Sequence, residues 1–126
     1  MQVQAAVSID TQYKTSSASI QVDAAGGMHL AYEYYEAVEE GIPTYGTYLY
    51  CTTACENSAN WSGIWFGEQV DEVQLKLTPT GQPRILYRAC ATDEYRNDYF
   101  YAACDQFCTD PMQWAAHAWR SIRVSD

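Results

Sequence analysis

The chain has 126 residues, of which 48% are hydrophobic, as expected of one folded domain and not of a disordered segment. Its net charge of -9 comes from 16 acidic and 7 basic residues without a basic run, which argues against nucleic acid and anionic membrane surfaces as partners. No apolar run reaches the roughly 20 residues that membrane insertion requires. The start, MQVQAAVSID, carries no signal-peptide pattern, so if the protein is exported we expect this chain to be a mature form or a cloned piece that starts at an added Met.

The elements in chain order are strands. Residues 5–10 predict a first, outer strand, and Ile20 and Val22 then alternate with polar residues. The turn sequence DAAGG follows, and Gly26 can adopt a positive φ there. Three further runs are expected on alternation and aromatic content: one around 28–32, one around 48–50, and one in NWSGIWFGEQV.

The pattern then repeats. Gly81 follows Gly26 by 55 residues, whereas Cys104 and Trp114 follow Cys51 and Trp61 by 53. The shift of two residues predicts a shorter loop in the second copy, and a period in the low fifties suits a four-stranded propeller blade. We therefore expect an all-β fold of nine strands: two four-stranded antiparallel propeller-type blades, at 18–71 and 72–126, after an N-terminal strand and linker at 1–17.

The last segment, DPMQWAAHAW, permits a second interpretation. Asp110 could cap a short helix with Pro111 at its first position. Its alignment with NWSGIWFGEQV, which is poor helix sequence, favours a strand.

The arrangement strand, DxxGxxHxxY, strand, YxxC…C…W, strand resembles the repeats of bacterial secreted β-propeller proteins related to the sialidase-like and Asp-box superfamily. The resemblance covers nearly the whole chain and implies blade architecture, but not one activity. The turns VDAAGGMH and LTPTGQPR depart from the Asp-box order. No arginine triad of a sialidase is recognisable among Arg84, Arg88, Arg96, Arg120 and Arg123.

The two CxxxC pairs, Cys51 with Cys55 and Cys104 with Cys108, allow a zinc site, a redox site or local disulfides. Equivalent positions of neighbouring blades should not converge on one metal, and a CxxC motif is absent. Disulfides, about 2 kcal/mol each, are favoured and predict an extracellular or cell-surface location. Cys90 lies outside the repeat and is expected to be a buried thiol.

Aromatic content suggests carbohydrate recognition, because aromatic faces stack on sugar rings. The candidate binding residues are Trp65, Trp119, Tyr87, Arg84 and His29. His29 and Arg84 share a repeat position, which equally fits structural hydrogen bonding. The loop with Asp93, Glu94, Asn97 and Asp98 is a calcium candidate, and otherwise no metal or cofactor is expected.

These patterns favour a non-enzymatic extracellular propeller module, structural or ligand-binding, with glycan as the first ligand class to test. Two blades do not close a ring, so either the chain is a piece of a longer protein or copies assemble with one another, by ring formation or strand exchange. The alternative function is a fragment of a sialidase-like glycoside hydrolase, which would need two suitably spaced carboxylates.

Overall fold

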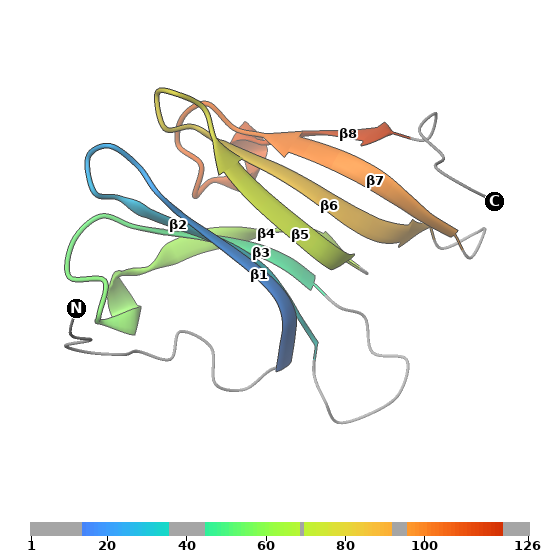
Figure 1. Cartoon of the computed structure of the whole chain (residues 1–126), viewed down its shortest axis with the longest axis horizontal. Helices are drawn as coiled ribbons and strands as arrows, with labels where there is room; N and C mark the ends of the chain where they lie inside the picture. Colours follow the sequence, from blue (N-terminus) through green and yellow to red (C-terminus); the bar gives the residue numbers. More distant parts are fainter. Residues whose placement is uncertain (1–13, 36–44, 69, 92–95, 120–126) are drawn as a thin grey trace.

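Figure 1 shows the structure, a computed structural model that describes residues 14–35, 45–68, 70–91 and 96–119. This part of the chain is all-β, with eight strands and two single-turn 3-10 helices. The first sheet contains β1 (Lys14–Val22), β2 (Met28–Tyr35), β3 (Tyr45–Cys51) and β4 (Ser62–Glu68), with η1 (Ser58–Asn60) before β4. The second contains β5 (Val70–Leu77), β6 (Pro83–Ala91), β7 (Arg96–Ala103) and β8 (Ala115–Trp119), with η2 (Pro111–Gln113) before β8.

Each sheet is an antiparallel meander with its four strands in chain order, as predicted. Even the irregularities recur: β1 has a register shift between Lys14 and Ser17, and β5 has one between Val70 and Glu72. The second sheet begins at Val70, two residues before the expected blade boundary. The expected strand at 5–10 lies outside the described residues.

The first hairpin turn of each sheet has the predicted glycine chemistry. Gly26 and Gly81 both have φ of 90°, a conformation that costs glycine little because it lacks a Cβ. The turns close with matching backbone bonds, since Gly26 N–H donates to Asp23 O at 3.0 Å and Gly81 N–H donates to Thr78 O at 2.9 Å. The two turns are therefore copies in backbone and differ in side chains.

The Cys–Trp loops are also copies. Disulfides join Cys51 to Cys55 and Cys104 to Cys108, with Cα–Cα distances of 5.8 and 5.7 Å, which confirms the predicted pairing. The indole N–H of the following tryptophan then donates to the carbonyl of the second cysteine in both copies, Trp61 to Cys55 at 2.9 Å and Trp114 to Cys108 at 2.8 Å.

The last segment forms the predicted strand, and the predicted helix cap is also present before it. Asp110 caps η2 by accepting from Met112 N–H at 3.0 Å, and Pro111 begins that single turn. The chain then enters β8 at Ala115 and pairs with β7. The capping signal is genuine, but it starts only one turn, because a strand must follow to complete the sheet.

The sheets lie one over the other, with both first hairpins at the same end (Figure 1). The core lies between them. The first sheet contributes Ala31, Tyr48 and Ile64, and the second contributes Val70, Val73, Leu75, Ile85, Tyr87, Ala89 and Ala102. Polar contacts join β1 to β5, where the Ser19 hydroxyl accepts from Leu75 N–H at 3.1 Å and the Ser17 hydroxyl accepts from Val73 N–H at 3.2 Å.

The packing brings different faces of the two repeats together. We call one face of each sheet the aliphatic face, which carries Ile20 and Leu30 in the first sheet and their equivalents Leu75 and Ile85 in the second. The opposite, mixed face carries Ser19, His29 and Ala31 in the first sheet and Gln74, Arg84 and Leu86 in the second. The register places each set on one side of its sheet, because partners across antiparallel strands share a face. The second sheet buries its aliphatic face against the mixed face of the first.

Candidate functional site

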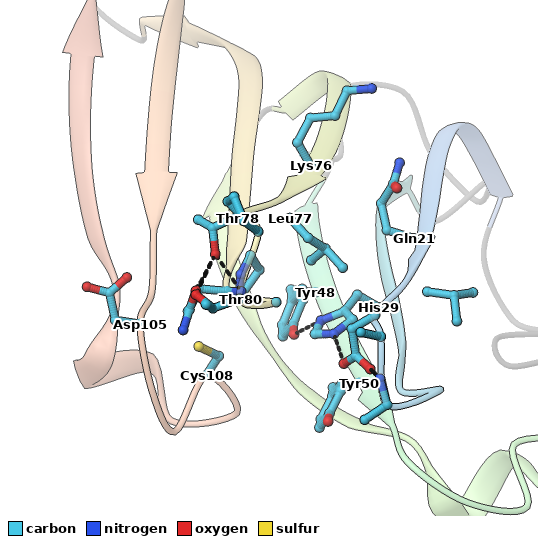
Figure 2. A pocket seen from close by; sticks show the side chains of 18 of the residues that line it. Gln21, His29, Tyr48, Tyr50, Lys76, Leu77, Thr78, Thr80, Asp105 and Cys108 are labelled. Atoms are coloured by element: carbon cyan, nitrogen blue, oxygen red, sulfur yellow. Dashed lines mark hydrogen bonds and ion pairs between the residues drawn. The ribbon is translucent and has the colours of Figure 1, made fainter.

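A cleft of about 760 Å³ opens between the sheets at the end where the two first hairpins lie (Figure 2). Its walls are the β1–β2 turn, the β5–β6 turn, strand β3 and the loop after β7. The residues that matter for its chemistry are Asp23, His29, Tyr48 and Tyr50 on one side and Thr78, Gln82, Asp105 and Phe107 on the other.

The first wall is organised around His29, which is 4% exposed. Its Nε2 lies 2.9 Å from Asp23 Oδ2 and its Nδ1 lies 2.7 Å from the Tyr48 hydroxyl (Figure 2). The other oxygen of Asp23 accepts backbone N–H groups of Ala25 at 3.1 Å and Gly27 at 2.8 Å. A turn carboxylate, a strand imidazole and a phenol on the next strand are thus joined in one chain of hydrogen bonds.

The pKa values of Asp23 and Tyr48, at the two ends of this series of hydrogen bonds, are both shifted. The hydrogen bond from His29, together with the backbone donors, lowers the pKa of Asp23, although burial opposes the shift. Nε2 of His29 faces a carboxylate oxygen of Asp23, and Nδ1 faces the Tyr48 hydroxyl, so both ring nitrogens have a hydrogen-bond partner. Burial, the largest cause, raises the pKa of Tyr48 well above its ordinary value. Tyr48 is therefore a neutral phenol at physiological pH.

This array has the outline of a nucleophile, base and orienting acid, but Tyr48 lacks the features of a nucleophile. A phenol acts as a nucleophile when its pKa is lowered, whereas that of Tyr48 is raised and the residue is only 1% exposed. The hydrogen bonds instead fix the β1–β2 turn to β3. Gly27 is needed beside them, because an added Cβ would lie 2.6 Å from Asp23 Oδ2.

The second wall has different side chains at the same repeat positions. Thr78 replaces Asp23, and its hydroxyl donates to the side-chain carbonyl of Gln82, the residue in the place of Gly27. Arg84 replaces His29, and its guanidinium donates to Asp105 Oδ1 at 2.7 Å and to Cys104 O at 3.1 Å. Asp105 is largely exposed, so its carboxylate can still accept from a ligand.

Two aromatic rings contribute apolar surface to the cleft. Tyr50 lies against His29 with ring centroids 4.6 Å apart, and burial raises the pKa of its hydroxyl. Phe107 is 73% exposed and has φ of 56°, in a region that residues with a bulky side chain rarely adopt. Ala54 has the same conformation in the first sheet, with φ of 51°. The loop therefore requires this backbone, whereas the exposed phenyl ring is peculiar to the second copy.

The predicted binding residues do not meet in one place. His29 lies in the cleft, and Arg84 lies beside it through Asp105. Tyr87 is 5% exposed and packs between Phe66 and Phe100 in the core, so its ring is not available to a ligand in this arrangement. Trp65 is 65% exposed on the aliphatic face of the first sheet, stacked on Tyr45.

Other predicted positions are described only in part. Trp119 ends β8, where it pairs with Tyr99. In the calcium candidate, Asp93 and Glu94 lie outside the described residues, whereas Asn97 and Asp98 are in β7. Within the described ranges no group of three metal-ligating side chains is found. No helix among those residues is long and apolar enough to span a membrane.

Sequence reasoning missed Asp23, Tyr48, Tyr50, Asp105 and Phe107 as cleft residues. One signal was present: where the repeat exchanges His29 for Arg84, it also exchanges Asp23 for Thr78. The two positions do touch in the first sheet, where His29 Nε2 lies 2.9 Å from Asp23 Oδ2. The contribution of Tyr48 depends on the pairing register of β2 with β3, which the repeat alignment alone does not provide.

The chain matches no known family, and neither a curated protein nor a solved structure is significantly similar to it.

Proposed function

We propose that this protein is a non-enzymatic, extracellular ligand-binding module built from two propeller-type blades, and that it binds glycans in the cleft between them. The observation that carries the proposal is the cleft itself, about 760 Å³ in volume and lined by aromatic rings beside hydrogen-bonding side chains. Binding sites for small molecules commonly combine these two kinds of surface.

The blade architecture is supported by the way the repeats stack. Each unit is a four-stranded antiparallel meander, and the second packs one face on the opposite face of the first. In a propeller every blade contacts its neighbours in this directional manner. The relation to secreted propeller proteins of the sialidase-like superfamily remains part of the proposal.

A glycan is favoured over a purely apolar ligand by the composition of the cleft. Phe107 and Tyr50 offer ring faces to the C–H groups of a sugar. Asp105, Gln82 and Lys76 lie around the cleft as acceptors and donors for hydroxyl groups. An extracellular location fits the two disulfides, which persist in oxidising compartments.

The glycoside hydrolase alternative has less support. An acid catalyst needs a raised carboxyl pKa, yet the pKa of Asp23 is lowered by its hydrogen bond with His29. Arg84 and Arg88 are engaged with Asp105 and Asp71, and do not form a free cluster for a sugar carboxylate. The polar groups of the cleft therefore favour holding a ligand over cleaving it.

The test is a glycan array followed by calorimetry with any glycan retained. Phe107→Gly should abolish or strongly weaken binding while the fold stays intact, since glycine suits the backbone at φ of 56°. Met112→Gly is the matched control, because Met112 is 85% exposed on η2 and does not line the cleft.

Three outcomes would contradict the proposal. Absence of binding across the array would exclude glycans as the ligand. Equal binding by the Phe107→Gly variant and the wild-type protein would show that the site lies outside the cleft. Turnover of a fluorogenic glycoside that Asp105→Asn abolishes would favour the hydrolase.

A further inference from the structure

Part of the aliphatic face of the first sheet is exposed where its copy in the second sheet is buried, although Tyr32 and Tyr34 on the same face are buried, at 7% and 6% exposed. Ile20 is 52% exposed, whereas its equivalent Leu75 is 1% exposed in the core. Val22 on the same face is 61% exposed and Trp65 is 65% exposed. Large apolar side chains gathered on one face are typical of an interaction surface.

The same face contains an unsatisfied polar atom. A hollow of about 250 Å³ is lined by Thr47, Leu49, Gly63, Ile64 and Trp65. The Thr47 hydroxyl is buried there without a hydrogen-bond partner among the described residues. Buried hydroxyls are nearly always bonded, so this face has the features of a surface that is completed by another molecule.

We infer that a second copy of this chain covers this face, with the mixed face of its second sheet. The argument follows from the contact already present inside the chain. There the aliphatic face of the second sheet packs on the mixed face of the first. The repeat supplies the same two faces once more, and Ile20, Val22 and Trp65 on one of them and Leu86 on the other are exposed. The inference concerns assembly and does not depend on the glycan proposal.

The second sheet carries suitable residues at the required positions. Ala31, fully buried at the centre of the internal contact, is replaced by Leu86, which is 37% exposed at the centre of the outward mixed face. Inside the chain, Ala31 lies in one cluster with Leu75 and Ile85. In the proposed contact, the equivalent Leu86 of the second copy would pack against Ile20 and Leu30 of the first. Apolar surface would then face apolar surface at the centre of the contact.

The strand edges match as well. Inside the chain, the Ser19 hydroxyl accepts from Leu75 N–H and donates to Leu75 O on the outer edge of β5. The equivalent edge belongs to β1, the first strand in its sheet order, and the equivalent side chain is the exposed Gln74. A side-chain amide can both donate and accept. Gln74 of the second copy can therefore hydrogen-bond to the backbone N–H and C=O of Ile20, as Ser19 does to those of Leu75.

Such a contact is heterologous, because each copy uses a different face. Repetition of it produces a closed ring or an open filament, in which every copy uses both faces. Propellers close with about four to eight blades, so two-bladed copies would close as assemblies of about two to four.

The experiment measures solution mass by light scattering from nanomolar to sub-millimolar concentration. We expect a discrete oligomer for the wild type and monomers for Ile20→Glu and for Leu86→Glu, each checked for native circular dichroism. Met112→Glu places the same charge on an exposed apolar position outside both faces, and it should assemble like the wild type.

Mixing the two monomeric variants gives the decisive result. Each retains one intact face, so the mixture should form a one-to-one complex that neither variant forms alone. A wild-type chain that stays monomeric throughout would overturn the inference and leave a neighbouring repeat or another protein as the occupant. Oligomers that survive both substitutions, or variants that do not complement, would also overturn it. Glycan binding by the Ile20→Glu monomer tests the cleft separately.

Discussion

The two sheets share one backbone and differ in how they stabilise it. In the first sheet, Asp23 and Tyr48 hold the imidazole of His29 between them. In the second, Thr78 bonds with Gln82, and Arg84 turns away to Asp105. The glycine turns, disulfides and tryptophan bonds recur unchanged. The repeated elements therefore define the backbone of each sheet, whereas the side chains around the cleft differ between the two copies.

The largest difference in stability between equivalent substitutions in the two sheets is expected at the repeat position of Ile20 and Leu75. Leu75→Ala should destabilise the protein by about 2–5 kcal/mol, because it removes a buried side chain from the core. Ile20→Ala should cost less than about 1 kcal/mol, because Ile20 is already half exposed. Urea denaturation in the monomeric Leu86→Glu background checks both values. Equal losses would mean that the folded monomer buries both aliphatic faces alike.

The disulfides should contribute equally to the two sheets. Replacing Cys51 and Cys55 by Ala, or Cys104 and Cys108 by Ala, should each cost about 2 kcal/mol, because each bridge closes a loop of the same small size. Thermal unfolding with and without reductant measures the effect. A protein lacking both bridges should be insensitive to reductant, and a strongly unequal pair would show that one loop is strained or redundant.

Acid should distinguish the sheets through Asp23. Its folded pKa is lowered below the ordinary value of 3.8, so the carboxylate adds stability that is fully present above that value and is lost as pH falls through the folded pKa. Asp23→Asn should cost roughly 1.5 kcal/mol at neutral pH and progressively less in acid. Thr78→Val, at the equivalent position, should show a cost that does not change over this range. A constant cost for Asp23→Asn would contradict the pairing.

The smallest effect concerns the strand edges. Ser19→Ala should cost about 1 kcal/mol, because Leu75 loses its side-chain partner on the edge of β5. Gln74→Ala, its repeat equivalent, should leave the unfolding of a monomer unchanged and weaken only the assembly. Denaturation measures the stability of the monomer, and light scattering measures the assembly. A monomer destabilised by Gln74→Ala would place that side chain in an internal contact.

The sequence predicted the fold to the extent that the fold is local and repeated. Gly26 and Gly81, the two Cys pairs and the strand after Trp114 followed from turn chemistry and alignment. Asp110 and Pro111 carried a true capping signal that stops after one turn, which local propensity could not show.

The site was less predictable because it depends on contacts between strands and between sheets. Tyr87 and Trp65 are both aromatic residues on strands, yet one is buried in the core and the other is exposed. Alternation assigns a residue to a face but does not say which face is covered. The cleft combines a turn, two strands and a loop from different repeats, so it exists only once the sheets are stacked.

The join between the sheets has an evolutionary consequence. β4 ends at Glu68 and β5 begins at Val70, so the chain passes from one unit to the next almost without spare length. The second unit packs one face on the opposite face of the first unit. A duplicated unit would consequently need only a very short connection, and it could use the same pair of faces as the existing contact.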